Sequence, residues 1–134
     1  MKVIVDTNVF ISGIFFSGPS SKVLEGWRDG KFDLILSPEI LAEYQEVVHR
    51  LSAKFKGVDI EHFIELVTIN STLISSPSLK EPICRDKNDD MFIACALSGN
   101  VKIIVSGDKD LHDISGYKGI EVIKPRAFVE GYLS

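Results

Sequence analysis

The apolar positions of this chain follow two patterns that alternate along the sequence. Short unbroken runs of aliphatic residues predict buried strands, and segments with apolar residues every three or four positions predict helices. The expected strands are residues 3–5, 34–36, 73–74, 101–105 and 120–123. The expected helices are residues 8–15, 23–30, 38–51, 59–69, 89–98, 110–114 and 125–133, with a loop over 75–88.

Strands that alternate with helices, and that are apolar throughout, indicate a parallel sheet covered on both faces. We therefore expect an α/β fold, with four to five parallel strands sandwiched by helices in three layers. The length of 134 residues suits one domain spanning residues 1–134. In such folds the functional crevice lies at the carboxyl edge of the strands.

Composition narrows the class of protein. The chain is 45% hydrophobic and 25% charged, as in globular proteins. Its longest apolar run, residues 91–97, is far short of the roughly 18 residues of a membrane span. Two cysteines, Cys84 and Cys95, are too few for a disulfide framework. These features predict a cytoplasmic protein without a membrane anchor.

The net charge of −4 argues, taken alone, against a nucleic-acid partner, because phosphates are normally neutralised by clustered Lys and Arg. A bound metal ion would weaken this argument, since it reverses the sign of the local charge and can itself bind a phosphate.

Two acids follow predicted strands directly. Asp6 ends the first strand, and Asp108 follows residues 101–105 after the Ser106-Gly107 turn. Both are expected at the carboxyl edge of the sheet. An N-cap of the following helix is an equally good interpretation of either residue, because Asp favours that position.

Glu43 lies in the second turn of the predicted helix 38–51, close to the same edge. Successive residues of an α-helix are rotated by about 100° about its axis. By this spacing, Glu43 is the acid nearest the border of the apolar stripe of that helix. A solvated surface position remains the alternative.

Asp86, Asp89 and Asp90 precede or open a helix that is apolar over residues 91–97. Asp89 is expected to cap this helix. Asp90 lies one step inside a buried helix, where its carboxylate must either face a cation or lose its hydration at a high cost in free energy.

Four acids from separate segments thus map to one edge of the sheet, namely Asp6, Glu43, Asp90 and Asp108. Close carboxylates repel unless a divalent cation keeps them ionised, and all-oxygen ligands select Mg²⁺ or Mn²⁺. Such ions support phosphodiester hydrolysis. No P-loop, Rossmann glycine pattern or nucleophile elbow is present. The histidines His49, His62 and His112 lack metal-ligand spacing and are expected at the surface or at helix ends.

At these residues the sequence resembles the PIN-domain family, in particular the VapC-like toxin nucleases. Residues 3–10 (VIVDTNVF) resemble its opening strand with the first metal acid, and residues 37–44 (SPEILAEY) the segment with its glutamate. Residues 86–94 (DKNDDMFIA) resemble the third motif, in which the acid precedes an Ile-Ala pair by three positions, hence Asp90. Residues 105–111 (VSGDKDL) resemble the fourth motif.

The resemblance implies metal-site roles for Asp6, Glu43, Asp90 and Asp108, with Asn8 and Ser106 as supporting polar residues. It also implies Mg²⁺- or Mn²⁺-dependent cleavage of RNA, by a homodimer that an antitoxin protein inhibits. The alternatives are a non-catalytic RNA- or protein-binding PIN module and a phosphatase of the haloacid dehalogenase type. Asp6-Thr7-Asn8 lacks the second acid that such phosphatases use.

Three cations flank the predicted site and are candidate phosphate contacts, namely Arg85, Lys87 and Lys109. Solvated ion pairs with neighbouring acids are the alternative role for them.

Overall fold

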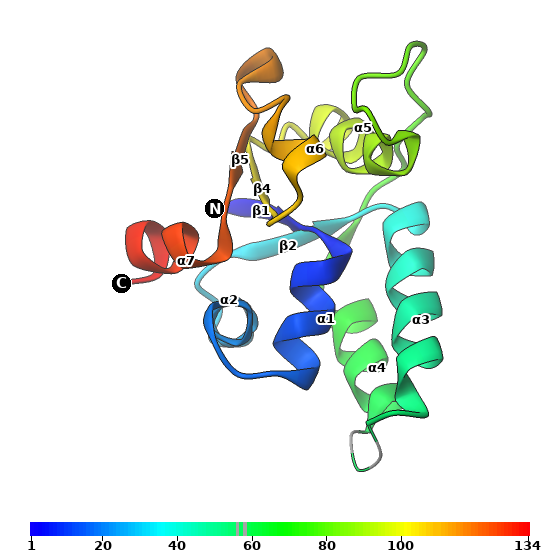
Figure 1. Cartoon of the computed structure of the whole chain (residues 1–134), viewed down its shortest axis with the longest axis vertical. Coiled ribbons are helices and arrows are strands. Elements are labelled where there is room, and N and C mark those ends of the chain that lie inside the picture. Colours follow the sequence, from blue (N-terminus) through cyan, green and yellow to red (C-terminus); the bar gives the residue numbers. More distant parts are fainter. Residues whose placement is uncertain (56, 58) are drawn as a thin grey trace.

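The computed structural model describes residues 1–55, 57 and 59–134. Its centre is a five-stranded sheet in the order β3-β2-β1-β4-β5, with every neighbouring pair parallel. The strands are β1 (Lys2–Val5), β2 (Asp33–Leu36), β3 (Thr72–Leu73), β4 (Ile103–Val105) and β5 (Glu121–Ile123). The predicted parallel α/β sheet is confirmed (Figure 1).

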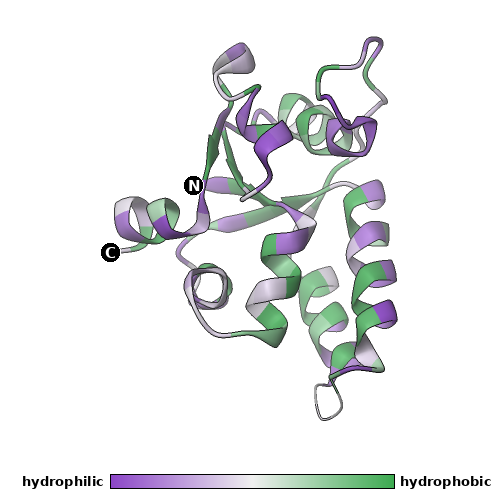
Figure 2. Ribbon diagram, viewed as in Figure 1, coloured by the Kyte–Doolittle hydropathy of each residue, from purple (hydrophilic) through white to green (hydrophobic). Residues whose placement is uncertain are grey.

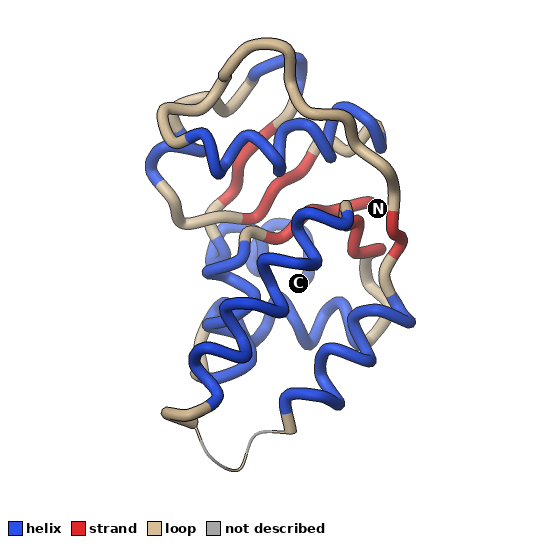
Figure 3. The backbone as a smooth tube through the Cα atoms, turned by 90° about the vertical axis from the view of Figure 1, so that its right-hand side faces the viewer, coloured by secondary structure: helices blue, strands red, loops and turns tan. Residues whose placement is uncertain are grey.

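Helices cover both faces of the sheet (Figures 1 and 3). In the view of Figure 1, α1 (Thr7–Phe15), α2 (Pro19–Arg28), α3 (Pro38–Ser52) and α4 (Ile60–Asn70) lie below it. The helices α5 (Asp90–Gly99) and α6 (Lys109–His112) lie above it. The chain ends with α7 (Pro125–Phe128), which packs against α2. This is the expected three-layer α/β/α arrangement.

The core lies against the central strands β1, β2 and β4, where both faces of the sheet are covered, which explains why these strands are apolar after the first residues of β1 and β2. Both residues of the edge strand β3 are exposed. The apolar residues of β1 are completely buried, and those of β2 are almost so. The rings of Phe10 and Tyr44 stack at 4.2 Å between α1 and α3. Figure 2 shows the same arrangement, with hydrophobic strands at the centre and hydrophilic residues on the outer faces of the helices.

The differences from the predicted boundaries have local causes. A 3-10 turn, η1 (Lys87–Asp89), occupies the end of the expected loop, and the Asp86 carboxylate accepts from the Asn88 N–H at 3.0 Å to cap it. For this reason α5 begins at Asp90 rather than Asp89. The terminal helix changes after Phe128 to a π-helical turn, η3 (Val129–Leu133). A second 3-10 turn, η2 (Tyr117–Gly119), precedes β5.

Within the described part of the chain, every helix is too short or too polar to cross a membrane.

Candidate active site

Asp6 lies where β1 ends and α1 begins, and it is 4% exposed. It occupies the N-cap position of α1, but its side chain makes no capping hydrogen bond. Its Oδ2 instead accepts from the Ser106 hydroxyl at 2.7 Å. Asp6 thus has the N-cap position that the alternative interpretation expected, but its carboxylate does not cap the helix and is directed across the sheet edge toward the residue that follows β4.

The environment of Asp6 disfavours its negative charge. Burial raises the pKa of Asp6, and the charges of Asp108 and Glu43 raise it further. The hydrogen bond from Ser106 acts in the opposite direction. Asp108 and Glu43 thus both lie within electrostatic reach of Asp6 at the carboxyl edge.

Ser106 connects the acids that follow β1 and β4. Its buried hydroxyl donates to Asp6 and accepts from the backbone N–H of Asp108 at 2.9 Å. The Asp108 carboxylate accepts from the Asp110 N–H at 2.9 Å and so caps α6, as the alternative interpretation expected. His112, at the end of α6, places Nε2 2.6 Å from the Ser106 carbonyl oxygen and holds the same turn.

Glu43 is half-buried on α3 and is fixed from two sides. The Thr7 hydroxyl donates to Glu43 Oε2, and the neighbouring Tyr44 hydroxyl donates to the carbonyl oxygen of Val5. The second contact ties α3 to the last residue of β1. Glu43 is therefore held at the same edge as Asp6, and the alternative of a freely solvated side chain does not apply.

Asp89 is 7% exposed, and the expectation that it caps a helix is wrong, because its side chain makes no capping hydrogen bond. Its Oδ2 is the one buried side-chain oxygen without a hydrogen-bond partner among residues 1–55, 57 and 59–134. Burial and, after it, the charges of Asp108 and Asp6 raise the pKa of Asp89 to about 7. Asp89, Asp108 and Asp110 offer ligand oxygens that all lie within 4.8 Å of one another.

Asp90 occupies a different environment from Asp89, although the two are consecutive. Its Oδ1 accepts from the backbone N–H of Cys84 at 2.7 Å, and both oxygens lie 3.3 Å from the N–H of Ile83. The sequence predicts that the Asp90 carboxylate either binds a cation or is buried without a partner. The structure shows a third arrangement, in which backbone donors of the preceding loop satisfy the carboxylate.

A sequence signal for Asp89 exists in the helical spacing. Phe92, Ile93 and Ala96 follow Asp89 by three, four and seven positions and are each at most 1% exposed. Asp89 thus continues the buried stripe of α5 back to the sheet edge. The sequence does not single out Thr7 and Asp110, because only contacts between distant segments reveal their positions in the site.

The remaining predicted residues surround the acids. Asn8 is exposed and, with Asp108, lines a cavity of about 310 Å³. Arg85 and Lys87 are exposed. The ammonium of Lys109 lies 3.4 Å from Asp113 in an exposed ion pair, which fits the alternative role of a solvated pair.

The donor set fits a hard divalent cation. All candidate ligands are carboxylate oxygens, which Mg²⁺ and Mn²⁺ prefer to nitrogen or sulfur. A buried oxygen without a hydrogen-bond partner is costly unless a ligand completes its environment. The residues best placed to hold a cation are Asp6, Asp89, Asp108 and Asp110, with Glu43 beside them.

Fold and site together define a class: a three-layer α/β protein whose parallel sheet carries an acidic cluster at its carboxyl edge. The sequence profile of the PIN domain matches residues 2–110. The chain belongs to the PIN domain family.

The chain is also similar to one curated relative and, in its fold, to two solved structures. The chain is 31% identical to the uncharacterized protein MJ1680 of Methanocaldococcus jannaschii, over 98% of this chain and 92% of that protein. Its fold is similar to that of VapBC2 from Rickettsia felis, solved with a DNA fragment from the promoter of its genes (TM-score 0.61, 15% identity, 92% of this chain and 98% of that chain). It is also similar to PAE2754 from Pyrobaculum aerophilum (TM-score 0.62, 14% identity, 99% of this chain and 90% of that chain).

Proposed function

We propose that this protein is a Mg²⁺- or Mn²⁺-dependent endoribonuclease, in which Asp6, Asp89, Asp108 and Asp110 form the metal site, with Glu43 beside them. Asp89 takes the place that the sequence motif gave to Asp90. One observation carries the proposal: the buried Asp89 carboxylate, with one oxygen unpartnered among the described residues, lies within 4.8 Å of ligand oxygens of Asp108 and Asp110. Membership of the PIN domain family supports the same reaction class.

A divalent cation at such a site supplies an activated water and neutralises charge on the phosphodiester. The chain contributes preorganised carboxylates. Ser106 orients Asp6 and the backbone of Asp108, and Thr7 orients Glu43. Fixed ligand positions lower the reorganisation needed when the substrate binds.

The test is cleavage of a fluorescently labelled single-stranded RNA by the purified protein in the presence of MnCl2. We expect cleavage that EDTA stops and that Asp6→Asn and Asp89→Asn abolish. A matched control is Asp33→Asn, which makes the same change on an exposed residue at the amino end of β2. Circular dichroism melting of each variant checks that the fold is kept.

The outcomes separate the competing functions. RNA that stays intact at every Mn²⁺ concentration overturns the proposal. Intact RNA with turnover of p-nitrophenyl phosphate favours the phosphatase alternative, whereas binding of RNA without cleavage favours the non-catalytic PIN module. A DNA strand of the same sequence tests the preference for RNA.

We also propose an antitoxin partner and a homodimeric state. Support for the antitoxin comes from the resemblance to VapC-like toxins and from the similar Rickettsia felis structure, which is a VapBC complex. If the gene adjoins a short reading frame, its purified product should suppress RNA cleavage at equimolar concentration. Light scattering after gel filtration tests the dimer, and a monomer mass would reject it.

A further inference from the structure

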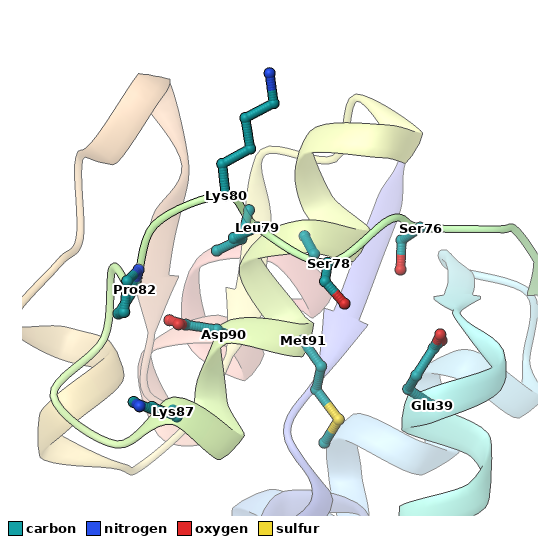
Figure 4. Close-up of a pocket in the computed structure, with 10 residues that line it drawn as sticks. Glu39, Ser76, Ser78, Leu79, Lys80, Pro82, Lys87, Asp90 and Met91 are labelled. Carbon is teal, nitrogen blue, oxygen red and sulfur yellow. The ribbon is translucent and has the colours of Figure 1, made fainter.

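A cavity of about 400 Å³, bordered by Glu39 and Asp90, lies between the loop before η1 and the start of α5 (Figure 4). Ser76, Ser78 and Pro82 line it from the loop, and Met91 lines it from α5. Its volume lies in the range of small-ligand sites, roughly 300–1,000 Å³.

The cavity adjoins the proposed metal site through two elements. Asp90 borders the cavity, and Asp89 next to it belongs to the acidic cluster. On α3, Glu39 borders the cavity and Glu43, one helical turn later, lies beside Asp6. The cavity and the proposed metal site are therefore bordered by neighbouring residues on α3 and at the start of α5.

The lining suits a nucleotide. Met91 offers a polarizable apolar surface on which a base can pack, and Ser78 offers a hydroxyl. In Figure 4, Glu39 and Lys87 lie at opposite ends of the view, while Lys80 extends away from the other residues. Lys87 forms no ion pair with any residue in the described part of the chain, so its charge is available to a phosphate.

The end of the loop that lines the cavity is anchored to α5. Asp90 accepts from the backbone N–H groups of Ile83 and Cys84, which anchors the loop to the first residue of α5. Because these contacts compensate the charge of Asp90, the cavity is less repulsive to a phosphate than its count of acids suggests. This end of the loop therefore needs little ordering when a ligand binds.

We propose that this cavity binds the nucleotide next to the scissile phosphodiester of single-stranded RNA. The base packs on Met91, and Lys87 contacts a phosphate. The Glu39 carboxylate, an acceptor, favours a base with an exocyclic amino group. This inference rests on the proposed ribonuclease function and adds the site that holds its substrate.

The first test measures binding without catalysis. The chain has only two methionines, Met1 and Met91, so ¹³C-methyl labelling gives one reporter in the cavity and one outside it. We expect nucleoside 5′-monophosphates at millimolar concentration, without metal, to shift the Met91 signal saturably and to leave Met1 unchanged. The shift should be smallest for UMP. No saturable shift of Met91 with any of the four nucleotides overturns the proposal.

Ser78→Trp tests the location, because this exposed residue lines the cavity and a larger side chain should fill it. We expect loss of the Met91 shift. The matched control is Ser75→Trp on the same loop, since Ser75 is exposed and outside the cavity. Equal nucleotide shifts in the two variants would place the binding elsewhere and overturn the proposal.

Kinetics separate this inference from the proposed function. We expect Lys87→Ala to raise KM for RNA at least threefold with little change in kcat, and Lys54→Ala, an exposed remote control of equal charge, to match the wild type. Wild-type RNA cleavage with unchanged KM in Lys87→Ala and Ser78→Trp would reject the cavity and keep the ribonuclease. A saturable Met91 shift without RNA cleavage would keep nucleotide binding and reject the ribonuclease.

Discussion

The Ser106 hydroxyl donates a 2.7 Å hydrogen bond to Asp6 Oδ2, although the two residues are 100 positions apart in the chain. Both are buried, and they follow the neighbouring parallel strands β4 and β1. The same hydroxyl accepts from the Asp108 N–H. Ser106 therefore sets the relative positions of two acids that belong to distant segments.

Replacing Ser106 by Ala should weaken both stability and metal binding. The change leaves the Asp6 carboxylate and the Asp108 N–H without their shared partner, which costs about 1–3 kcal/mol. It also removes the contact that lowers the pKa of Asp6, so that pKa should rise further. Urea denaturation measures the loss of stability, and Mn²⁺ titration measures the loss of metal affinity. Ser106→Thr keeps the hydroxyl and should recover Mn²⁺ affinity, and an Ala variant with wild-type Mn²⁺ affinity would contradict this role.

Asp89 and Asp90 should respond differently to the same substitution. Asp89→Asn should abolish Mn²⁺ binding and stabilise the metal-free protein, because a buried, unpaired and repelled charge is removed. Asp90→Asn should retain Mn²⁺ binding but destabilise the protein by about 1–2 kcal/mol, because it weakens charge-assisted contacts to Ile83 and Cys84.

Isothermal titration with MnCl2 and thermal melting of both variants check this contrast. The sequence motif predicts the reverse, namely that Asp90→Asn abolishes metal-dependent cleavage. If Asp90→Asn loses Mn²⁺ binding while Asp89→Asn keeps it, the assignment from the motif holds and ours fails.

The choice between these two acids shows where sequence reasoning reaches its limit. The strands were predictable because buried β-branched runs such as residues 3–5 have few other interpretations. Asp6 and Asp108 could be placed because both follow such strands. Helical spacing places Asp89 on the buried stripe of α5, but the orientations of Asp89 and Asp90 also depend on the 3-10 turn Lys87–Asp89, which local pattern does not determine.

Contacts between distant segments were less predictable still. The hydroxyl of Thr7 donates to Glu43, 36 positions later, and no local sequence pattern predicts this contact. The same holds for the backbone donors of Ile83 and Cys84 that satisfy Asp90, since a loop of this length allows many paths.

Thr7→Val should test the orientation of Glu43. Valine has nearly the same shape but lacks the hydroxyl that donates to Glu43 Oε2, so the carboxylate loses its fixed position. We expect kcat for RNA cleavage to fall about tenfold, with a loss of stability of about 1 kcal/mol. Thr7→Ser keeps the donor and serves as the matched control. Equal kcat values for the Val and Ser variants would show that the hydroxyl does not position Glu43.

The stability of the metal-free protein should fall as the pH rises. The pKa of Asp89 is about 7 in the folded protein against an ordinary 3.8, so the folded state binds more protons than the unfolded state between these values. The contribution of Asp89 protonation to the free energy of unfolding is therefore fully present below about pH 4 and is lost as the pH rises to about 7. Burial raises the pKa of Asp6, which acts in the same direction.

Urea denaturation in EDTA should show a decrease of about 2 kcal/mol between pH 5 and pH 8 from these groups. Asp89→Asn should flatten most of this dependence, whereas Asp33→Asn, on an exposed acid outside the site, should leave it unchanged. Stability that rises over this interval in the wild type, or an equal slope in Asp89→Asn, would contradict the assignment.

Added Mn²⁺ should reverse the pH dependence, because the cation binds the ionised carboxylates and compensates their repulsion. At a concentration about 100 times its Kd, a ligand specific for the folded state adds roughly 2.7 kcal/mol. The gain in melting temperature on adding MnCl2 should be larger at pH 8 than at pH 5, since at pH 5 a proton on Asp89 competes with the cation. A gain of equal size at both pH values, or one that persists in Asp89→Asn, would place the bound cation away from Asp89.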